Sequence, residues 1–509
     1  MPVHIASAML EAAAPRHHPD AAPADDWFSG QPRGLSILFF VELWERFSYY
    51  GMRALLALFM VTPAAEGGLG LGTVETATLY GSYTMAVYML SIPGGFIADR
   101  LTGARWAVMT GGSIIALGHY ALAIPAEVTF YAGLILVALG TGLFKPNISV
   151  LVGALYAPDD QRRDAGFSLF YMGINLGAFI APLVTGFLAQ SVWFKAWLSA
   201  HGFDPNTSWH WGFGAAGIGM TLALAIFAVR SRSLGPIGLR PVLAPGTWWK
   251  IGGVIAATAA LLSLSLLSDR DGWQGLRWMF LGLPLAAVAW AGWQSGEGAR
   301  RMAAVGVFFI ASMLFWALFE QAGLSIALFA DKLTRNDVWG LPFPSSWFQS
   351  LNALFVIALS PVFAWAWTRL GARQPSSTVK FALGLMFLGA SFLLMVPAAQ
   401  LTLEGRVSPL WLVGLFFLQT VGELFLSPVG LSLMTRLAPA GLAGSVLGLW
   451  FLGSAFGNKL AGVLGSSFES QDAPALAAFF FNQGVFVLVA ALALLCLVPW
   501  MKRLMGDVR

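Results

Sequence analysis

Four ionisable residues lie within a segment that is otherwise apolar enough to enter a lipid bilayer. The segment VELWERFSYYGMRALL, residues 41–56, contains Glu42, Glu45, Arg46 and Arg53. Arginine stays protonated at any physiological pH, whereas a glutamate gains or loses a proton according to its surroundings. Glutamates that share an arginine could therefore bind and release protons as the arginine moves. This pattern indicates proton movement coupled to something that competes for the arginine.

The same residues share one face of the helix that this segment is expected to form. At about 100° per residue, a stripe about 100° wide contains Glu42, Glu45, Arg46, Tyr49 and Arg53. Apolar and aromatic residues cover much of the remaining circumference. Glu42 and Arg46 are also four residues apart, which is a spacing at which opposite charges pair on a helix. Because such a stripe cannot face lipid, we expect it to line an interior path.

The composition of the whole chain is that of a membrane protein with many spans. Of the 509 residues, 57% are hydrophobic and 11% are charged, whereas about a quarter of the residues in an ordinary soluble protein are charged. The 57 glycines and 21 tryptophans suit closely packed transmembrane helices with aromatic belts. Basic cytoplasmic loops account for the net charge of +4, so no nucleic-acid partner is implied. The single cysteine, Cys496, excludes an internal disulfide.

Fourteen apolar segments have about the length that a helix needs to cross a bilayer. They are residues 35–62, 74–98, 105–125, 130–156, 165–190, 209–229, 247–267, 273–294, 302–330, 347–369, 377–399, 407–436, 442–466 and 475–501. An even number of spans places both termini on one side. Lys and Arg are concentrated in the loops on that side, which predicts that both termini are cytoplasmic. The polar tail, residues 1–33, has no apolar region typical of a signal peptide.

Eight ionisable residues fall inside these predicted spans. They are Glu42, Glu45, Arg46, Arg53, Lys145, Glu320, Glu423 and Lys459. One charge near the bilayer centre costs on the order of 3 kcal/mol, so eight unpaired charges would outweigh the stability of a typical domain, about 5–15 kcal/mol. We therefore expect these side chains to face one another or a water-filled cavity. Lys459 is the exception, because its position permits either a brace between helices or a side chain that reaches the interface.

Several stretches of the sequence resemble the signatures of one transporter family. ELWERFSYYG (42–51) is similar to the first-helix signature of the proton-dependent oligopeptide transporters, a branch of the major facilitator superfamily. FYMGINLGAFIAPL (170–183) resembles their fifth-helix signature. Stretches similar to their fourth, seventh and tenth helices, and to the superfamily's loop motif between helices 2 and 3, are GTGLFKPNISVLVG (140–153), FWALFEQAG (315–323), VGELFLSPVGLSL (421–433) and GGFIADRLTGAR (94–105). The resemblance extends from about residue 35 to residue 500 in the order of the family.

The resemblance implies an all-α membrane protein with the major facilitator fold. Twelve core transmembrane helices would form two six-helix bundles, with two additional helices between them. The corresponding divisions are a polar tail 1–33, an N-terminal bundle 34–230, a linker 231–300, a C-terminal bundle 301–501 and a tail 502–509. In this fold, helices 1, 4, 7 and 10 surround a central cavity, where the charges inside the spans would meet. The expected location is the bacterial inner membrane, which the chain would cross many times.

The resemblance also assigns roles to the residues of this cavity. Those expected to couple protons are Glu42, Glu45, Arg46 and Glu320. Those expected to bind a peptide are Arg53, Tyr49, Tyr50, Tyr88, Lys145, Asn175, Trp316, Asn352, Glu423 and Trp450. Arg53 and Lys145 would receive the carboxyl end of the peptide. Its amino end would be received by Asn175, Asn352 and Glu423.

Two pairs of opposite charges are expected to act as gates. Arg53 with Glu320 would close the extracellular side, and Lys145 with Glu423 the cytoplasmic side. Animal members of the family carry a histidine on the second helix, but residues 74–98 contain no histidine. Proton handling would then rest on Glu42, Glu45 or Glu320.

Elementary chemistry agrees with this assignment, because a short peptide is a zwitterion and needs a fixed cation and a fixed anion at a distance from each other. The predicted function is therefore proton-coupled import of di- and tripeptides by alternating access. The protein is expected not to be an enzyme and to need no cofactor or metal beyond the coupling proton. Its partners would be di- and tripeptides and membrane lipid, without an obligate protein partner.

Carriers of the same fold for other solutes are the main alternative, namely drug antiporters and carriers of amino acids or nitrate. Nitrate carriers tend to lack the glutamate motif, and Glu423 would repel an anion. The chain has no Gly-Lys dipeptide, which excludes a P-loop, and no HExxH motif. The asymmetric distribution of its charges is not that of a channel filter.

Overall fold

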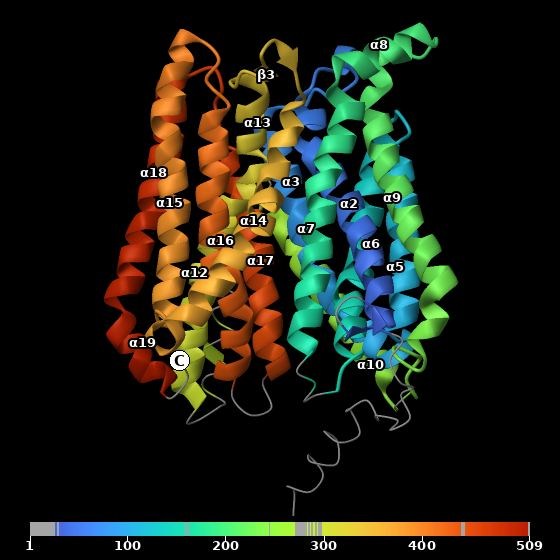
Figure 1. The fold of residues 1–509 in the computed structure, drawn as a ribbon, viewed down its shortest axis with the longest axis vertical. Coiled ribbons are helices and arrows are strands. Elements are labelled where there is room, and N and C mark those ends of the chain that lie inside the picture. Colours follow the sequence, from blue (N-terminus) through green and yellow to red (C-terminus); the bar gives the residue numbers. More distant parts are fainter. Residues whose placement is uncertain are drawn as a thin grey trace, which may run out of the picture.

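The protein is described here by a computed structural model that covers residues 26–27, 30–157, 160, 162–243, 245–269, 298–438 and 443–506, with the single positions 282, 286, 289, 290 and 293. Long helices run between the two ends of the molecule (Figure 1). We call the end at which α2 (Arg33–Val61) begins the terminal face, because α19 (Val498–Met505) also lies there. The opposite end, with α8 (Val192–Ala200), is the distal face.

The N-terminal half of the chain forms one bundle of helices. In addition to α2, its members are α3 (Thr73–Met89), α4 (Ser91–Ile97), α5 (Ala104–Leu122), α6 (Glu127–Gly153), α7 (Arg163–Gln190) and α9 (Ser208–Arg230). α2 packs against α7 and α9, and α5 packs against α6 and α9. Two short antiparallel strands, β1 (Asp26–Trp27) and β2 (Gln31–Pro32), precede α2.

The C-terminal half forms a second bundle. In addition to α19, its members are α12 (Ala299–Phe319), α13 (Ser325–Lys332), α14 (Ser350–Leu370), α15 (Ser377–Leu401), α16 (Leu410–Leu437), α17 (Ala443–Gly465) and α18 (Ala473–Cys496). A short antiparallel hairpin, β3 (Asp337–Val338) and β4 (Leu341–Pro342), follows α13 at the distal face. Short helical turns connect or extend the longer helices. They are η2 (Ala64–Glu66), η3 (Ala98–Thr102), η4 (Pro205–Thr207), η5 (Ser231–Leu234), η7 (Glu320–Gly323), η8 (Ser345–Gln349), η9 (Gly371–Arg373) and η10 (Thr402–Glu404).

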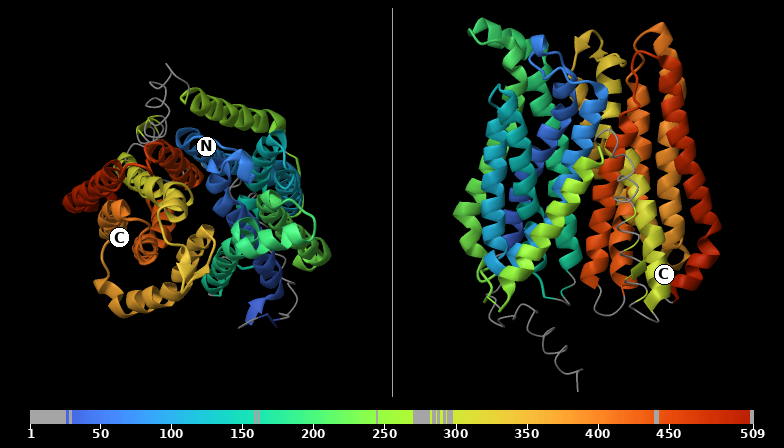
Figure 2. Two further views of the ribbon diagram at one scale, coloured as in Figure 1. Left: turned by 90° about the horizontal axis from the view of Figure 1, so that it is seen from above. Right: turned by 180° about the vertical axis from the view of Figure 1, so that it is seen from behind.

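One additional helix, α10 (Thr247–Leu267), lies on the outside of the molecule. It crosses obliquely and packs against α3 and α4, as the yellow-green helix of Figure 2 shows. Apart from five single positions, the second additional helix predicted at 273–294 lies outside the described residues. The sequence did not predict the short helix α8, which projects sideways at the distal face (Figure 1). The Ser191 hydroxyl begins α8 by accepting a hydrogen bond from the backbone N–H of Trp193, which satisfies a free helix N–H group.

Two segments that the sequence predicted as continuous helices are interrupted. The segment 74–98 divides at Leu90, between α3 and α4. The segment 302–330 divides at η7, between α12 and α13. At the second break, the backbone of Gly323 approaches the side chain of Tyr80 so closely that an added Cβ would lie 2.0 Å from the Tyr80 hydroxyl oxygen. Hydropathy does not detect such a break, because the residues immediately on both sides are mostly apolar.

The two bundles meet through close contacts in the distal half of the molecule. There α3 packs against α17, and α7 packs against α14. A Cβ added at Gly81 would lie 2.9 Å from the Cα of Gly462, so these backbones almost touch. The Trp347 indole N–H donates to the backbone carbonyl of Leu183 over 3.1 Å. The bundles are therefore held together at the distal face.

Eight helical segments of the described chain are long and apolar enough to cross a membrane. α2 is not among them, because four ionisable residues interrupt its apolar sequence. The charged residues of α2 lower its hydropathy although the helix lies inside the bundle. We therefore expect these charges to be paired or to have a function.

Candidate functional site

The charged stripe predicted on α2 is buried. Glu42 and Arg46 are each 3% exposed, and Glu45 is 0% exposed. The Nε group of Arg46 donates to Glu45 Oε2 over 2.5 Å and lies 3.1 Å from Glu42 Oε1. One guanidinium therefore serves two carboxylates, and the group carries one excess negative charge when both are ionised.

These three side chains keep unused hydrogen-bonding capacity. Within the described part of the chain, no partner is found for Glu42 Oε2, Glu45 Oε1 or Arg46 Nη2. Buried polar atoms are normally paired, and an isolated buried charge is costly. A proton on either glutamate would remove the excess charge and leave an ion pair. The group therefore has the composition of a buried proton-binding site.

A second ion pair joins the two bundles. The guanidinium of Arg53, on α2, pairs with the carboxylate of Glu320, where α12 gives way to η7. The Nε group of Arg53 also donates to the hydroxyl of Tyr80, on α3, over 2.8 Å. Arg53 is 8% exposed and Glu320 is 3% exposed, so the pair is shielded from solvent. Separation of the bundles at this point would have to break it.

Lys145 provides a further cation on α6. It is half-buried, and its ammonium lies 4.1 Å from the centre of the Tyr88 ring on α3. Its charge also interacts electrostatically with Glu42, Glu45 and Arg46 on α2. It interacts in the same way with Glu320 of the second bundle. Lys145 thus belongs to the same charged cluster as the α2 stripe.

The second bundle contributes an anion with its own support. Glu423, on α16, is half-buried, and its Oε2 accepts a hydrogen bond from the Asn352 amide over 3.0 Å. The same amide donates to the Thr420 hydroxyl, also over 3.0 Å. Tyr50, on α2, interacts electrostatically with both Glu320 and Glu423. It also interacts electrostatically with Arg46 and Arg53 of its own helix, so Tyr50 is coupled to charges of both bundles.

Comparison with known proteins identifies the family. The family model of the POT family matches residues 105–237 and 282–478. The chain is 40% identical to the uncharacterized transporter YclF of Bacillus subtilis, across 94% of this chain and 96% of that protein. It is 39% identical to the peptide transporter YePEPT of Yersinia enterocolitica, across 95% of this chain and 97% of that protein. This chain belongs to the POT family.

Solved structures of POT family members have the same fold as this one. A mutant of the peptide transporter POT in complex with alafosfalin superposes with a TM-score of 0.84 at 41% identity, over 96% of this chain and 99% of that chain. A POT family transporter in complex with 5-aminolevulinic acid gives a TM-score of 0.81 at 31% identity, over 94% and 99% of the two chains. The all-α major facilitator fold predicted from the sequence of this POT family member is confirmed.

Other predicted site residues of this POT family member lie beside the charged cluster or within its helices. The ring of Tyr49 lies 5.3 Å below the guanidinium of Arg46. The amide of Asn175 donates to the backbone carbonyl of Tyr171 on its own helix, over 2.9 Å. Trp316 is half-buried on α12, and its indole nitrogen has no hydrogen-bond partner among the described residues.

In this structure, Trp450, Lys145 and Glu423 each have contacts within a single bundle. Trp450 is 7% exposed and packs inside the C-terminal bundle, with its ring 6.2 Å from that of Phe381. Lys145 and Glu423, both of which the structure describes, are not paired with each other. Each instead has a partner within its own bundle, namely Tyr88 for Lys145 and Asn352 for Glu423. This agrees with a structure in which the bundles contact each other in the distal half.

Sequence reasoning missed Tyr80 as a member of the site and left two possibilities for Lys459. Tyr80 could have been suspected from the three tyrosines of the span 74–98. Lys459 is a brace between helices, because it pairs with Asp269 and donates to the Ser82 hydroxyl over 2.9 Å. The sequence placed Asp269 in a loop after α10, so hydropathy gave no signal for this pair.

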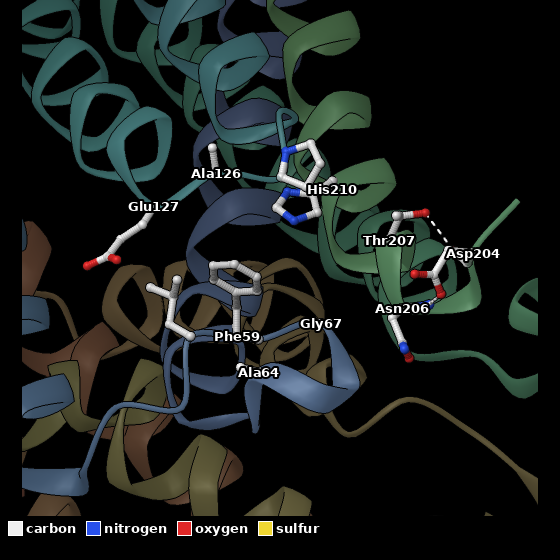
Figure 3. A pocket seen from close by; sticks show the side chains of 12 residues that line it. Phe59, Ala64, Gly67, Ala126, Glu127, Asp204, Asn206, Thr207 and His210 are labelled. Atoms are coloured by element: carbon white, nitrogen blue, oxygen red, sulfur yellow. Dashed lines mark hydrogen bonds between the residues drawn. The ribbon is translucent and has the colours of Figure 1, made fainter.

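A pocket of about 300 Å³ lies at the distal face, away from the charged cluster. Figure 3 shows it between the end of α2 and the start of α9, with Phe59 and His210 on its wall and Glu127 and Asp204 at its edges. All of its lining residues belong to the first bundle. A site that couples two bundles must contact both, so we do not place the substrate there.

Proposed function

We propose that this POT family member imports di- and tripeptides together with protons, by alternating access to a site between its two bundles. The observation that carries the proposal is the position of opposite charges on the two bundles. Arg53 and Lys145 belong to the first bundle, and Glu423 belongs to the second. The relatives support the substrate class, since one is named a peptide transporter and another, from Lactococcus lactis, a di-/tripeptide transporter.

The peptide would be held by its two ends. Its carboxylate would lie between Arg53 and Lys145, and its ammonium would bind Glu423. Asn352 would fix the orientation of Glu423 through the 3.0 Å hydrogen bond, and Asn175 would assist at the amino end. Aromatic side chains would accept the variable parts of the peptide, and these are Tyr49, Tyr50, Tyr88, Trp316 and Trp450. Specificity for side chains would be loose, because the strong contacts go to groups that every peptide has.

Proton binding would be linked to the peptide through competition for arginine. A peptide carboxylate that pairs with Arg53 displaces Glu320 from its partner. A buried carboxylate without a partner is stabilised by a proton. Glu42 and Glu45 stand in the same relation to Arg46, so any of the three glutamates would serve as the proton site.

Alternating access would rest on the contacts between the bundles. If the terminal face is cytoplasmic, as the distribution of basic residues indicates, the distal contacts close the site to the outside. Pairing of Lys145 with Glu423 would then close the cytoplasmic side in the other state. Residues 34–230 and 301–501 would move as the two units in the bacterial inner membrane, connected by residues 231–300, with the tails 1–33 and 502–509 in the cytoplasm.

Uptake into liposomes tests this function. Purified protein in vesicles with an acidic exterior should accumulate a labelled dipeptide, and a protonophore should abolish the accumulation. Uptake that ignores the protonophore would refute the coupling. A counterflow panel of dipeptide, tripeptide, single amino acid, nitrate and a cationic drug then identifies the substrate class. Exchange of one of the last three without the peptides would refute peptide transport.

A further inference from the structure

A buried polar triad lies at the contact between α3 and α17, away from the peptide site. The ammonium of Lys459, on α17, pairs with the carboxylate of Asp269 and donates to the hydroxyl of Ser82, on α3, over 2.9 Å. The Ser82 hydroxyl in turn donates to Asp269 Oδ2 over 3.3 Å. The side chains of Lys459 and Asp269 are 4% and 13% exposed. Three parts of the chain therefore meet here, namely the two bundles and the linker.

The linker helix α10 packs across the same contact. Leu261 and Leu264 of α10 pack against a small apolar cluster formed by Met85 of α3 and Phe456 of α17. The Ser265 hydroxyl lies 3.6 Å from the sulfur of Met85. Asp269 follows the end of α10 by two residues. The helix thus brings a carboxylate to the point where one bundle meets the other.

The place of the triad along the helices makes it sensitive to bundle separation. Ser82 follows Gly81, and Lys459 lies less than one turn before Gly462, where the two backbones approach most closely. This contact belongs to the distal half. If the bundles separate at the distal face, the Lys459–Ser82 hydrogen bond must break, and Asp269 can no longer contact both Lys459 and Ser82.

We propose that Asp269 makes the linker helix a lock on the distal closure, in which the carboxylate holds Lys459 of one bundle against Ser82 of the other. This proposal rests on the alternating access proposed above. The linker is then a part of the transport equilibrium rather than a passive connection. Without the Asp269 carboxylate, the buried Lys459 ammonium would lose this ion pair, and removal of one partner of a buried pair strongly destabilises the arrangement that buries it. Opening the distal face would hydrate the Lys459 ammonium and so reduce this free-energy cost.

Distances between spin labels test the lock without any transport assay. Val74→Cys, at the start of α3, and Ser467→Cys, just after α17, are exposed positions at the distal ends of the two helices. They are introduced together with Cys496→Ala, which removes the single native thiol. Pulsed dipolar spectroscopy in lipid nanodiscs without substrate then gives the ratio of long to short distances. We expect Asp269→Asn to raise this ratio about tenfold or more.

Three further variants separate a lock from a merely structural brace. Ser82→Ala removes only the hydrogen bond to the first bundle, and we expect a smaller rise in the ratio. The double variant Asp269→Asn with Lys459→Met removes both charges of the pair, so it should regain thermal stability but retain part of the rise in the ratio. Glu127→Gln makes the same carboxylate-to-amide change at an exposed position of the distal face and should leave the distances unchanged.

An unchanged ratio in a folded Asp269→Asn protein would overturn the proposal. If that variant does not fold, the ratio in Ser82→Ala decides, and no change there overturns it equally. Peptide uptake by the parent protein is measured separately. A parent that takes up no peptide while Asp269→Asn still shifts the distances would refute the proposed substrate and leave the lock intact.

Discussion

Glu423→Gln tests whether the amino end of the peptide meets the second bundle. Gln has the shape of Glu, and its side-chain oxygen can still accept the 3.0 Å hydrogen bond from Asn352. The substitution therefore removes the negative charge and little else. A hydrogen bond to a charged group contributes about 1.5–3 kcal/mol, and each 1.4 kcal/mol is about a factor of ten in affinity. We expect the variant to bind dialanine roughly tenfold to a hundredfold more weakly.

Acetylation of the peptide is the matching change on the ligand, because it removes the charge that Glu423 is proposed to bind. N-acetyl-dialanine has no ammonium, so the parent protein should bind it weakly, and Glu423→Gln should change that affinity by less than about twofold. Isothermal titration of both proteins with both peptides completes a double-mutant cycle, in which the coupling energy isolates the contact. Equal losses for the two peptides would refute the assignment of Glu423 to the amino end.

Three other substitutions probe the remaining parts of the site. Arg53→Ala should weaken the binding of peptides with a free carboxylate more than that of amidated peptides, and titration with matched pairs would show equal losses if Arg53 does not contact the carboxylate. Glu45→Gln should abolish accumulation against a gradient while leaving peptide exchange in liposomes, so undiminished accumulation would remove Glu45 from the proton path. Tyr80→Phe should lower the free energy of unfolding by about 1–3 kcal/mol, because Arg53 Nε loses its acceptor. Thermal unfolding against Tyr83→Phe checks this, since the Tyr83 hydroxyl has no partner among the described residues and its loss should matter less.

The sequence predicted the features that depend on a single helix. The positions of the long helices and the clustering of Glu42, Glu45 and Arg46 follow from apolar length and from a period of 3.6 residues. The ion pair between Arg53 and Glu320 could not be predicted from the pattern of a single helix, because the two residues are 267 positions apart. The family resemblance supplied that pairing, and no periodicity could have done so.

The features that the sequence did not predict depend on contacts between distant segments. The break after α12 lies where Gly323 approaches Tyr80 of the other bundle, a contact that is visible only when both helices are in place. Asp269 was assigned to a loop, because hydropathy cannot show that a residue beyond the end of a helix is buried by another bundle. The position of Trp450 inside its bundle depends on neighbours such as Phe381, which the family motif does not specify.

The close packing around Gly323, which has no side chain, can be used to change the balance between conformations. A methyl group there would lie 2.0 Å from the Tyr80 oxygen and 3.2 Å from Nε of Arg53, so the Tyr80 side chain would have to move and its hydrogen bond with Arg53 would be disturbed. Gly323→Ala would therefore weaken the contact between the two bundles in the distal half. One added carbon atom would thus shift the protein toward the conformation that is open at the distal face, and make that conformation easier to isolate for structural study.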